Sequence, residues 1–469
     1  MWSWSKTRAL TNGRSPTPGD ARGCVVSPLK GLQGSDSPLS RSRERGAGGV
    51  RAEGQSGQAR GHSSRGQGRA GQKALTLAFL ALLLTACSPT PPSGPSGETA
   101  ELSPVAAMRG GTAEGYALAD RPRTFAFPVD HGPHPEFRTE WWYWVGQLGA
   151  EDGHRFGFQL TFFRQALVAE AEERASAWSS RDVFMGHFAV ADLGREGGAG
   201  AGRFHSSERF ARAAAGLAGA TFDEGSGAFQ VWVEDWSAEA AGAEHYPVRL
   251  RARGDGVTLD LDLVGGKDPV LQGDDGLSRK GSQPGAASYY YAMTHIDAQG
   301  TITVDATDED EPDRSFEVEG IAWLDREWST SGLDSGQIGW DWLALWLDDG
   351  RELMVYQMRR DDGTIDPYNH GALVSVDGVK RHLDRDQATL EAVGSWTSPR
   401  SGDTYPGGWR VSVPDEGLEL EVTPLRPDQE LDVAYRYWEG AVGVRGQGPD
   451  GPVTGRGYLE MVGYTSLPD

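Results

Sequence analysis

The side chains that could do chemistry are concentrated in two short segments of the chain. The first runs from Asp130 to Tyr143, where one glycine and two prolines predict a rigid loop that leads into an aromatic strand. The loop carries two imidazoles, three carboxylates and one arginine, so His131 and Glu140 are candidates for acid or base chemistry. We expect no metal site, because His131 and His134 flank a Gly-Pro pair and cannot use helical spacing. In the alternative interpretation, these side chains hydrogen-bond backbone groups that the rim of a sheet leaves unpaired.

The second segment, Gly320 to Ser329 (GIAWLDREWS), places carboxylates among tryptophans. Strand alternation predicts two opposite faces, with Trp323, Asp325 and Glu327 on one and Leu324, Arg326 and Trp328 on the other. A carboxyl group among indole rings is desolvated, and this raises its pKa unless a cation offsets the effect. Asp325 and Glu327 are therefore candidate proton donors, because an acid that stays neutral at pH 7 can protonate an alkene or a leaving group. The alternative is a buried Asp-Arg-Glu network that closes one end of a barrel.

Aromatic side chains also recur in stripes, at residues 289–291, 340–346 and 435–438. Such stripes either fill a core or line a cavity for an apolar ligand. The 16 tryptophans of the chain favour the cavity, which we expect inside a barrel. The predicted ligand-binding residues are Trp141, Trp142, Trp323, Trp328, Trp340, Trp342, Tyr290 and Tyr437.

The elements that would position these residues are strands. Residues 257–263 and 339–347 alternate as half-buried strands do, and the Asp-Gly pair at 349–350 predicts a hairpin. No segment after residue 115 keeps a helical period for three turns, although residues 165–178 are a candidate for a short helix or a loop insertion. Regularly spaced strands and turns are typical of all-β sandwiches and barrels. The acidic, Pro-containing stretch at 305–313 predicts a linker or long loop rather than a calcium site.

The N-terminal part of the chain concerns targeting. Residues 1–73 are rich in Arg, Gly and Ser, which predicts disorder or an extension from a wrongly chosen start codon, and they end in a basic signal region. Residues 74–87 join an apolar run of eleven residues to Leu-Thr-Ala-Cys, which resembles the bacterial lipobox, so Cys87 is the predicted lipidation site. Residues 88–114 then form a Pro/Ser/Gly tether. We therefore expect a lipid-anchored, extracytoplasmic protein of a bacterial cell envelope.

Charge excludes one class of partner. The chain carries a formal net charge of −22, but its first 86 residues hold 13 basic and 4 acidic residues, so the rest carries −31. Nucleic-acid binding needs a basic face, and we expect no nucleic-acid partner.

Several segments resemble the AttH-like family, which is grouped with the hydroxyneurosporene synthases (carotenoid 1,2-hydratases). They are the Phe-Pro and Asp-His-Gly motifs of residues 127–132, EWWYWVG at 140–146, GIAWLDREWS at 320–329, GWDW at 339–342 and GYLEMVGY at 457–464. The similarity extends from about residue 120 to the end of the chain. It implies two tandem lipocalin-like antiparallel β-barrels, which we place at residues 115–304 and 316–469 with an acidic linker at 305–315.

The resemblance also implies a chemistry. The best-understood members add water across the terminal double bond of acyclic carotenoids without a cofactor, and an aspartic acid protonates the alkene. That aspartate aligns with Asp325, but Arg326 and Glu327 stand where those members have His and Asn. A neighbouring arginine is expected to lower the pKa of Asp325 and so to weigh against carotenoid hydration.

These observations lead to two hypotheses. In the first, the chain binds an elongated apolar ligand, such as an isoprenoid or a lipid, and acts as a cofactor-independent hydratase or hydrolase through Asp325, Glu327, Glu140 and His131. In the second, it is a non-catalytic lipid carrier or an accessory protein of an envelope ABC-type transporter. Arg326 would then depend on Asp325 as a structural charge partner.

Overall fold

The computed structural model describes most of the chain between residues 113 and 464. The described residues are 113–170, 176, 178–195, 202–242, 244–308, 311–330 and 333–464. The predicted signal, Cys87 and nearly all of the tether lie outside them. No helix in the described part is long and apolar enough to cross a membrane.

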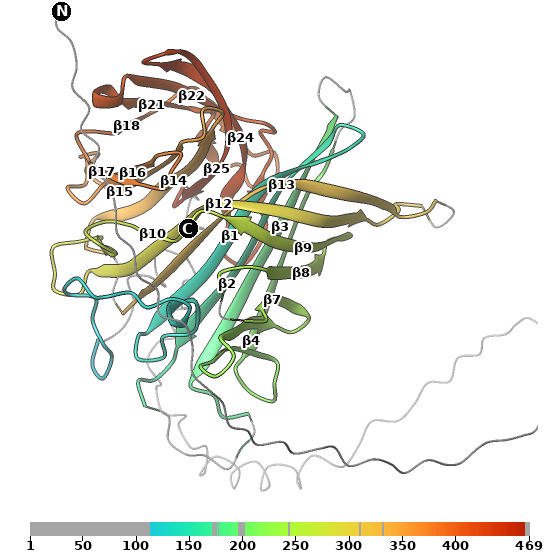
Figure 1. Cartoon of the computed structure of the whole chain (residues 1–469), viewed down its shortest axis with the longest axis vertical. Coiled ribbons are helices and arrows are strands. Elements are labelled where there is room, and N and C mark those ends of the chain that lie inside the picture. The colour runs from blue at the N-terminus through green and yellow to red at the C-terminus, as the bar shows by residue number, and fades with distance from the viewer. Residues whose placement is uncertain are drawn as a thin grey trace, which may run out of the picture. The chain divides into compact units, whose positions relative to one another are not determined.

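The first sheet is antiparallel and has 13 strands (Figure 1). Its strands are β1 (Thr139–Ala150), β2 (His154–Ala166), β3 (Asp182–Arg195), β4 (Phe204–Arg212), β5 (Ala218–Asp223), β6 (Ala228–Val233), β7 (Trp236–Ala240), β8 (Val248–Gly254), β9 (Val257–Gly266), β10 (Val270–Leu271), β11 (Leu277–Arg279), β12 (Ala287–Val304) and β13 (Arg314–Ser329). Their order is β4-β3-β2-β1-β13-β12-β9-β8-β7-β6-β5, and β10 and β11 pair with β12. Before β1 lies a short 3-10 helix, η1 (Val129–His131).

The second sheet has ten antiparallel strands, and a separate two-stranded ribbon lies beside it. Its strands are β14 (Gln337–Leu347), β15 (Glu352–Arg360), β16 (His370–Val374), β17 (Lys380–Asp384), β18 (Thr389–Ala392), β21 (Trp409–Val413), β22 (Leu418–Pro424), β23 (Glu430–Leu431), β24 (Tyr437–Gly448) and β25 (Gly451–Val462). Their order is β17-β16-β15-β14-β25-β24-β22-β21-β18, and β23 pairs with β24. The ribbon consists of β19 (Ser395–Thr397) and β20 (Thr404–Pro406), and the 3-10 helix η2 (Pro414–Glu416) precedes β22.

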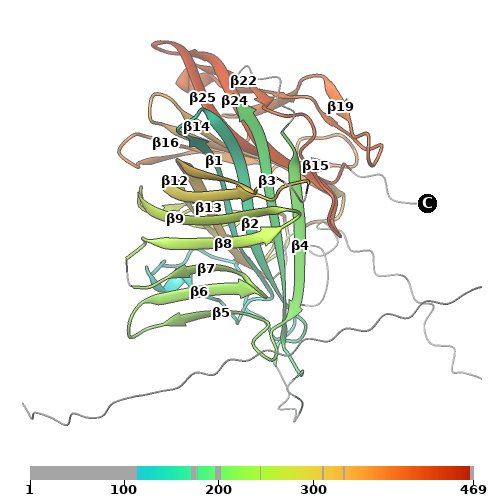
Figure 2. The same ribbon diagram turned by 90° about the vertical axis from the view of Figure 1, so that its right-hand side faces the viewer.

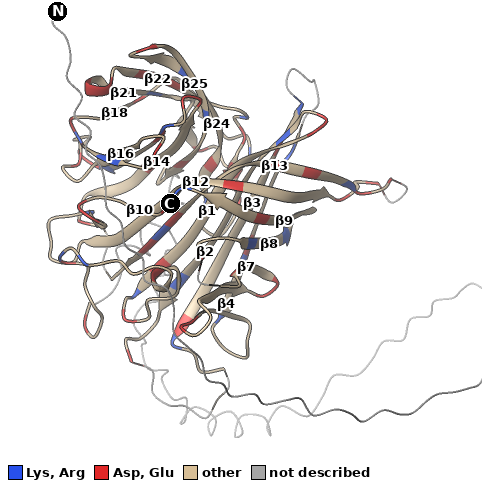
Figure 3. Cartoon of the chain, in the orientation of Figure 1, with Lys and Arg blue, Asp and Glu red and all other residues tan. Residues whose placement is uncertain are grey.

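Each sheet curls around its own core, as the all-β prediction with tandem lipocalin-like barrels requires. In the first sheet β5 to β9 run across β2 to β4 (Figure 2), and Phe188 of β3 contacts Trp236 of β7 with ring centroids 5.6 Å apart. Along β9 the apolar residues of the alternating segment are buried, while Asp260 pairs with Arg249 of β8 at 2.7 Å on the other face. Figure 3 shows acidic residues of β9 in red and basic residues of β8 in blue. The predicted alternation of residues 257–263 is thus confirmed. The described part of residues 165–178 contains no helical residue.

The position of the acidic segment differs from the expected linker. Val304 of β12 pairs with Arg314 of β13, so residues 305–313 connect two neighbouring strands of the first sheet. β13 pairs along its whole length with β12 or β1, and it therefore belongs to the first sheet. The chain passes to the second sheet between Ser329 and Gln337. The acidic composition reflects an exposed hairpin connection rather than a boundary between barrels.

The buried aromatic residues form three clusters. The interior of the first sheet is filled by buried side chains that include Trp142, Trp144, Trp236 and Trp328. The interior of the second sheet is filled by side chains that include Trp409 and Trp438. A third cluster, which includes Tyr143, Tyr290, Trp323, Trp342 and Trp346, lies where the outer faces of the two sheets meet.

The two sheets approach each other closely along this third cluster. A Cβ added to Gly157 of β2 would lie 2.7 Å from Cβ of Ala441 of β24, so the contact needs a glycine there. Gln147 of β1 donates hydrogen bonds to the backbone oxygens of Val442 (2.8 Å) and Gly457 (2.6 Å). Packing of the sheets therefore holds β1, β13, β14 and β25 in fixed relation around the site described next.

Candidate functional site

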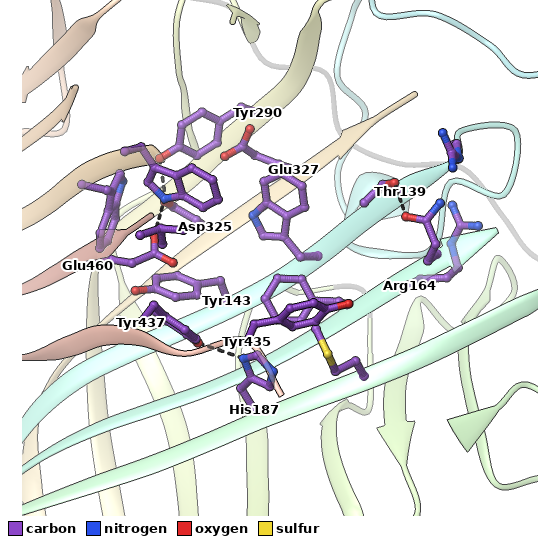
Figure 4. Close-up of a pocket in the computed structure, with 18 of the residues that line it drawn as sticks. Thr139, Tyr143, Arg164, His187, Tyr290, Asp325, Glu327, Tyr435, Tyr437 and Glu460 are labelled. Carbon is purple, nitrogen blue, oxygen red and sulfur yellow. Dashed lines mark hydrogen bonds between the residues drawn. The ribbon is translucent and has the colours of Figure 1, made fainter. Parts of the chain in front are cut away.

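A cavity of about 460 Å³ lies between the two sheets (Figure 4). This volume is within the usual range for small-molecule sites. Its walls come from β1 to β4, β12 and β13 of the first sheet and from β14, β15, β24 and β25 of the second. The prediction of a tryptophan-lined space inside a barrel was wrong in position, because the large indoles of the first barrel fill its interior and the space lies outside it.

Pairing of neighbouring strands sets three rows of side chains on the first sheet. The inner row consists of His187, Thr161, Tyr143 and Asp325. The middle row consists of Phe210, Met185, Phe163, Trp141, Glu327 and Tyr290. The outer row consists of Val183, Gln165 and Thr139. The inner row is buried and the outer row is half-buried, so the cavity opens toward the outer row.

The second sheet covers the inner row. Trp342 of β14 pairs with Tyr356 of β15 on one side and with Glu460 of β25 on the other. The Trp342 ring meets the Tyr143 ring edge-on, with centroids 5.4 Å apart. The result is a polar inner end and an aromatic middle, and Figure 4 shows Asp325 and Glu460 on the side opposite Thr139 and Arg164.

Asp325 is the central acid of the inner end. The residue is 4% exposed, and its carboxyl group accepts hydrogen bonds from Tyr290 Oη (2.5 Å) and Trp323 Nε1 (2.6 Å). Burial raises the pKa of Asp325 well above its usual range, although these two hydrogen bonds oppose the shift and the charge of Glu327 adds to it. The arrangement favours a protonated carboxylic acid at the cavity wall.

Arg326 does not offset this effect, contrary to the expectation from the sequence. The two residues are adjacent on β13, so their side chains leave the strand on opposite faces. The guanidinium of Arg326 is fully buried, forms an ion pair with Glu140 and lies 3.9 Å from the centroid of the Trp142 ring. It also donates to the backbone oxygen of Gly132 at 2.6 Å. The alternative prediction of a structural network between Asp325 and Arg326 is therefore wrong, whereas the predicted division of residues 323–328 into two faces is confirmed.

Two further acids share the inner end. Burial raises the pKa of the half-buried Glu460 to about 7, although Trp340 Nε1 donates a hydrogen bond to it at 2.9 Å. Burial, reinforced by the charge of Glu460, raises the pKa of Glu439 well above its usual range. Glu439 accepts a hydrogen bond from Tyr143 Oη. The inner end thus holds three carboxyl groups whose pKa values are raised toward their neutral forms.

Glu327 occupies the middle row and has a different environment. Its carboxylate accepts a hydrogen bond from Ser288 Oγ and lies 3.4 Å from Nζ of Lys280. Lys280 in turn lies 4.4 Å from the centroid of the Tyr356 ring. Glu327 thus faces the cavity as predicted, but it is matched by a cation, whereas Asp325 is not.

Glu140 lies on the opposite face of the first sheet and does not reach the cavity. It is fully buried and forms ion pairs with Arg164 and Arg326. Burial alone would raise the pKa of Glu140, but the charges of these two arginines hold it well below its usual range. Its carboxylate also accepts the backbone N–H of His134 at 3.0 Å. This geometry matches the rim interpretation of the sequence.

His131 also lies away from the cavity, at the end of η1. Its Nδ1 is 2.6 Å from Tyr291 Oη and its Nε2 is 2.8 Å from Nδ1 of His245. Burial, reinforced by His245, lowers the pKa of His131 to about 3, which keeps the ring neutral. His134 stacks on Trp328 with centroids 3.7 Å apart. The structure therefore does not place His131 beside Asp325.

The predicted aromatic ligand contacts divide between cavity and core. Those that line the cavity are Trp141, Trp340, Trp342, Tyr290 and Tyr437. Trp323 lies directly beside Asp325 as a hydrogen-bond donor. Trp142 and Trp328 belong to the interior of the first barrel.

Several cavity residues were not predicted from the sequence. They are Glu460, Lys280, Tyr143, His187 and Tyr356. Tyr143 and Glu460 do lie in the motifs EWWY and GYLEMV, and their alternation with apolar neighbours was the available signal. His187 and Lys280 lie in segments without such a signal. Within the described part, two cavity-lining residues have buried polar atoms without a hydrogen-bond partner, Tyr356 Oη and His187 Nε2. In the same part, no group of three or more His, Cys, Asp or Glu residues is arranged to hold a metal ion.

Comparison with known proteins identifies the family. The model of the AttH-like family matches residues 118–464, so the chain belongs to that family. A crystal structure described as an AttH from Nitrosomonas europaea is 33% identical with a TM-score of 0.60, and the match covers 73% of this chain and 98% of that one. Kievitone hydratase from Nectria haematococca is 14% identical with a TM-score of 0.55, covering 75% and 96% of the two chains, which shows a shared fold. The comparison with curated protein sequences finds no match.

Proposed function

We propose that this member of the AttH-like family binds an elongated apolar ligand in the cavity between its sheets and adds water to it, with Asp325 as the proton donor. The observation that carries the proposal is a carboxyl group that favours its neutral form at the wall of an aromatic cavity. A neutral acid of this kind is what protonation of a weakly basic carbon requires. The fold shared with kievitone hydratase supports hydration as the class of reaction.

The proton transfer begins the reaction. The O–H bond of Asp325 breaks as a C–H bond forms at one carbon of the ligand's double bond, and the π electron pair leaves a carbocation at the other carbon. Trp342 and Tyr143 line this end of the cavity, and aromatic rings stabilise cations through their faces.

Capture by water completes the reaction. A water oxygen bonds to the cationic carbon, and the proton it releases returns to the Asp325 carboxylate, so the ligand gains one H and one OH. Glu460 lies at the same end of the cavity and holds the attacking water through its carboxyl group. Tyr290 and Trp323 keep the Asp325 carboxyl group in place through their hydrogen bonds.

The substitution Asp325→Asn tests this function. The purified chain is incubated with a total bacterial lipid extract in water labelled with heavy oxygen, and mass spectrometry detects species that gain labelled water. We expect wild-type turnover, and in Asp325→Asn a loss of about 100-fold or more with co-purifying lipid retained. Asp341→Asn is the matched control, because Asp341 is buried and has a raised pKa but pairs with Arg359 away from the cavity. No labelled product with the wild type, or equal turnover in both Asp325 forms, would contradict the proposal.

A lipid carrier, whether acting alone or with a transporter, is the second candidate. The observation in its favour is the opening of the cavity, where Leu167 and Phe210 are 49% and 65% exposed. Exposed apolar groups at an opening suit transfer of a lipid to a membrane or to a partner. A carrier would exchange labelled lipid between vesicles at the same rate in the wild type and in Asp325→Asn, and it would yield no hydrated product.

We also propose that lipid on Cys87 anchors the protein in a bacterial envelope. The support is the order of basic region, apolar run and cysteine at residues 65–87. Metabolic labelling with an alkyne fatty acid, compared between wild type and Cys87→Ala, tests this point. Labelling that persists in Cys87→Ala would contradict it.

A further inference from the structure

We infer that the ligand of this cavity is an amphiphile with an anionic head group, bound by Arg138 at the opening while its apolar chain extends toward the acid end. The inference rests on the proposed function, because it names the class of ligand that the same cavity would take. It depends on the distribution of charge along the cavity wall.

Three cationic side chains line the cavity, and two of them have carboxylate partners. Arg164 forms ion pairs with Glu140 and Asp182, the latter at 2.8 Å. Lys280 lies 3.4 Å from Glu327. These two cations are therefore matched by the protein itself.

Arg138 differs from them. It lines the cavity and is half-buried, and its backbone N–H donates to the hydroxyl of Thr330. Among the described residues, no carboxylate lies within ion-pair distance of its guanidinium. A guanidinium presents a planar set of donors that fits carboxylate, phosphate or sulfate groups. Arg138 is thus the cation that a ligand can neutralise.

The position of Arg138 fixes the direction of the ligand. Arg138 directly precedes Thr139 of the outer row, whereas Tyr143 of the inner row pairs with Asp325. The strand from Arg138 to Tyr143 spans about 16 Å. Between them lies the aromatic part of the middle row, with Trp141 and Phe163 paired across β1 and β2. This length and polarity suit an alkyl or isoprenoid chain attached to a head group at the opening.

The inner end disfavours the reverse orientation. Asp325, Glu439 and Glu460 all have raised pKa values there because of burial. An anionic head among these carboxyl groups would be desolvated and would face groups of like charge on ionisation. The apolar terminus of the ligand, rather than its head, is therefore the part presented to Asp325.

Two probes that differ only in the head group test the inference. Laurate and dodecanol are titrated into the purified full chain, and binding is followed by tryptophan fluorescence from Trp340 and Trp342 in the cavity wall. We expect the wild type to bind laurate at least about tenfold more tightly than dodecanol, as a charge-assisted contact requires. Arg138→Gln should remove this preference and leave the affinity for dodecanol unchanged.

Control variants separate charge from folding. Arg138→Lys keeps the charge and should keep most of the preference, so it guards against a folding defect at this position. Arg385→Gln removes an exposed arginine whose partner, Asp386, lies at 3.5 Å, and it should change neither affinity. Lys280→Gln should either lower the affinity for both probes equally or change neither affinity, so the preference for laurate should remain.

The outcomes distinguish this inference from the proposed function. Equal affinity of the wild type for both probes, or an equal loss of both in Arg138→Gln, overturns the anionic head while the apolar-ligand site stands. Loss of selectivity in Lys280→Gln instead of Arg138→Gln overturns the orientation. Failure of both probes to bind the wild type overturns the inference together with ligand binding in the proposed function.

Discussion

Adjacent residues of β13 face two different environments. On the cavity face, Asp325 accepts hydrogen bonds from Tyr290 and Trp323, and no arginine pairs with it within the described part. On the core face, Arg326 pairs with Glu140, and Glu140 also pairs with Arg164. The core face therefore pairs the charge of Arg326 with a carboxylate, whereas the cavity face leaves Asp325 without a cation partner.

This difference separates a stabilising role from a functional one. A buried carboxylate with two guanidinium partners remains charged and contributes to the fold, because removal of either sign leaves an uncompensated charge. A buried acid without a cation keeps its proton, and folding must then hold a proton that the unfolded chain would release. Groups of the second kind concentrate at functional sites and reduce stability there. Neutralising an acid should accordingly lower the free energy of unfolding on the core face and raise it on the cavity face.

The largest expected effect is that of Glu140→Gln. The amide has the same shape as the carboxylate, but it leaves Arg326 buried without a countercharge and Arg164 with Asp182 alone. We expect the free energy of unfolding in urea to fall by about 3–5 kcal/mol at neutral pH. Glu239→Gln, at a residue with a 42% exposed side chain, is the control and should change it by no more than about 1 kcal/mol. A loss of less than about 1 kcal/mol in Glu140→Gln would contradict the charge matching of the core face.

The next effect is a pH dependence due to Glu460. Burial raises its pKa from an ordinary value of 4.5 to about 7 in the folded state. The folded state thus binds this proton more tightly than the unfolded chain does. The stability that proton binding contributes is fully present below pH 4.5 and is lost as the pH rises through 7.

The variant Glu460→Gln should lack this loss. As the pH rises from 4.5 to above 7, the unfolding free energy of the wild type should therefore fall relative to that of the variant, by no more than about 3 kcal/mol. Urea unfolding at several pH values measures it. Glu319→Gln, at an exposed position of β13, is the control, and the pH dependence of its unfolding free energy should be the same as that of the wild type. If the unfolding free energy of Glu460→Gln also changed with pH as that of the wild type does, Glu460 would be an ordinary carboxylate that is ionised at neutral pH.

The sequence was sufficient to predict which residues of β13 share a face. Alternation is local, and so Asp325 and Glu327 could be assigned to one face and Arg326 to the other without a fold. The all-β class followed from the same alternation and from the Asp-Gly turns. The resemblance to the AttH-like family added the tandem arrangement, which the comparisons then established.

What could not be predicted depends on pairing between distant residues. Arg326 and Glu140 are 186 residues apart, and their ion pair requires the register of β1 with β13. Without that register, the nearest cation to Asp325 in sequence was Arg326, and the inferred direction of the pKa shift was wrong. The location of the cavity is likewise set by packing of the two outer faces, to which strands as distant in sequence as β1 and β25 contribute together.

The smallest expected effect, opposite in sign to the first, is that of Asp325→Asn on stability. Burial raises the pKa of Asp325, so the stability linked to its proton is present at acidic pH and is lost as the pH rises. The amide keeps the shape and the acceptor for Tyr290 without this cost. We expect the free energy of unfolding of the variant in urea to exceed that of the wild type by about 1 kcal/mol at neutral pH, with a smaller difference at acidic pH. Asp262→Asn, at a position with a 45% exposed side chain, is the matched control and should change stability little. If Asp325→Asn destabilised the protein as Glu140→Gln does, the two faces of β13 would not differ in charge matching, and Asp325 would be an ionised structural group.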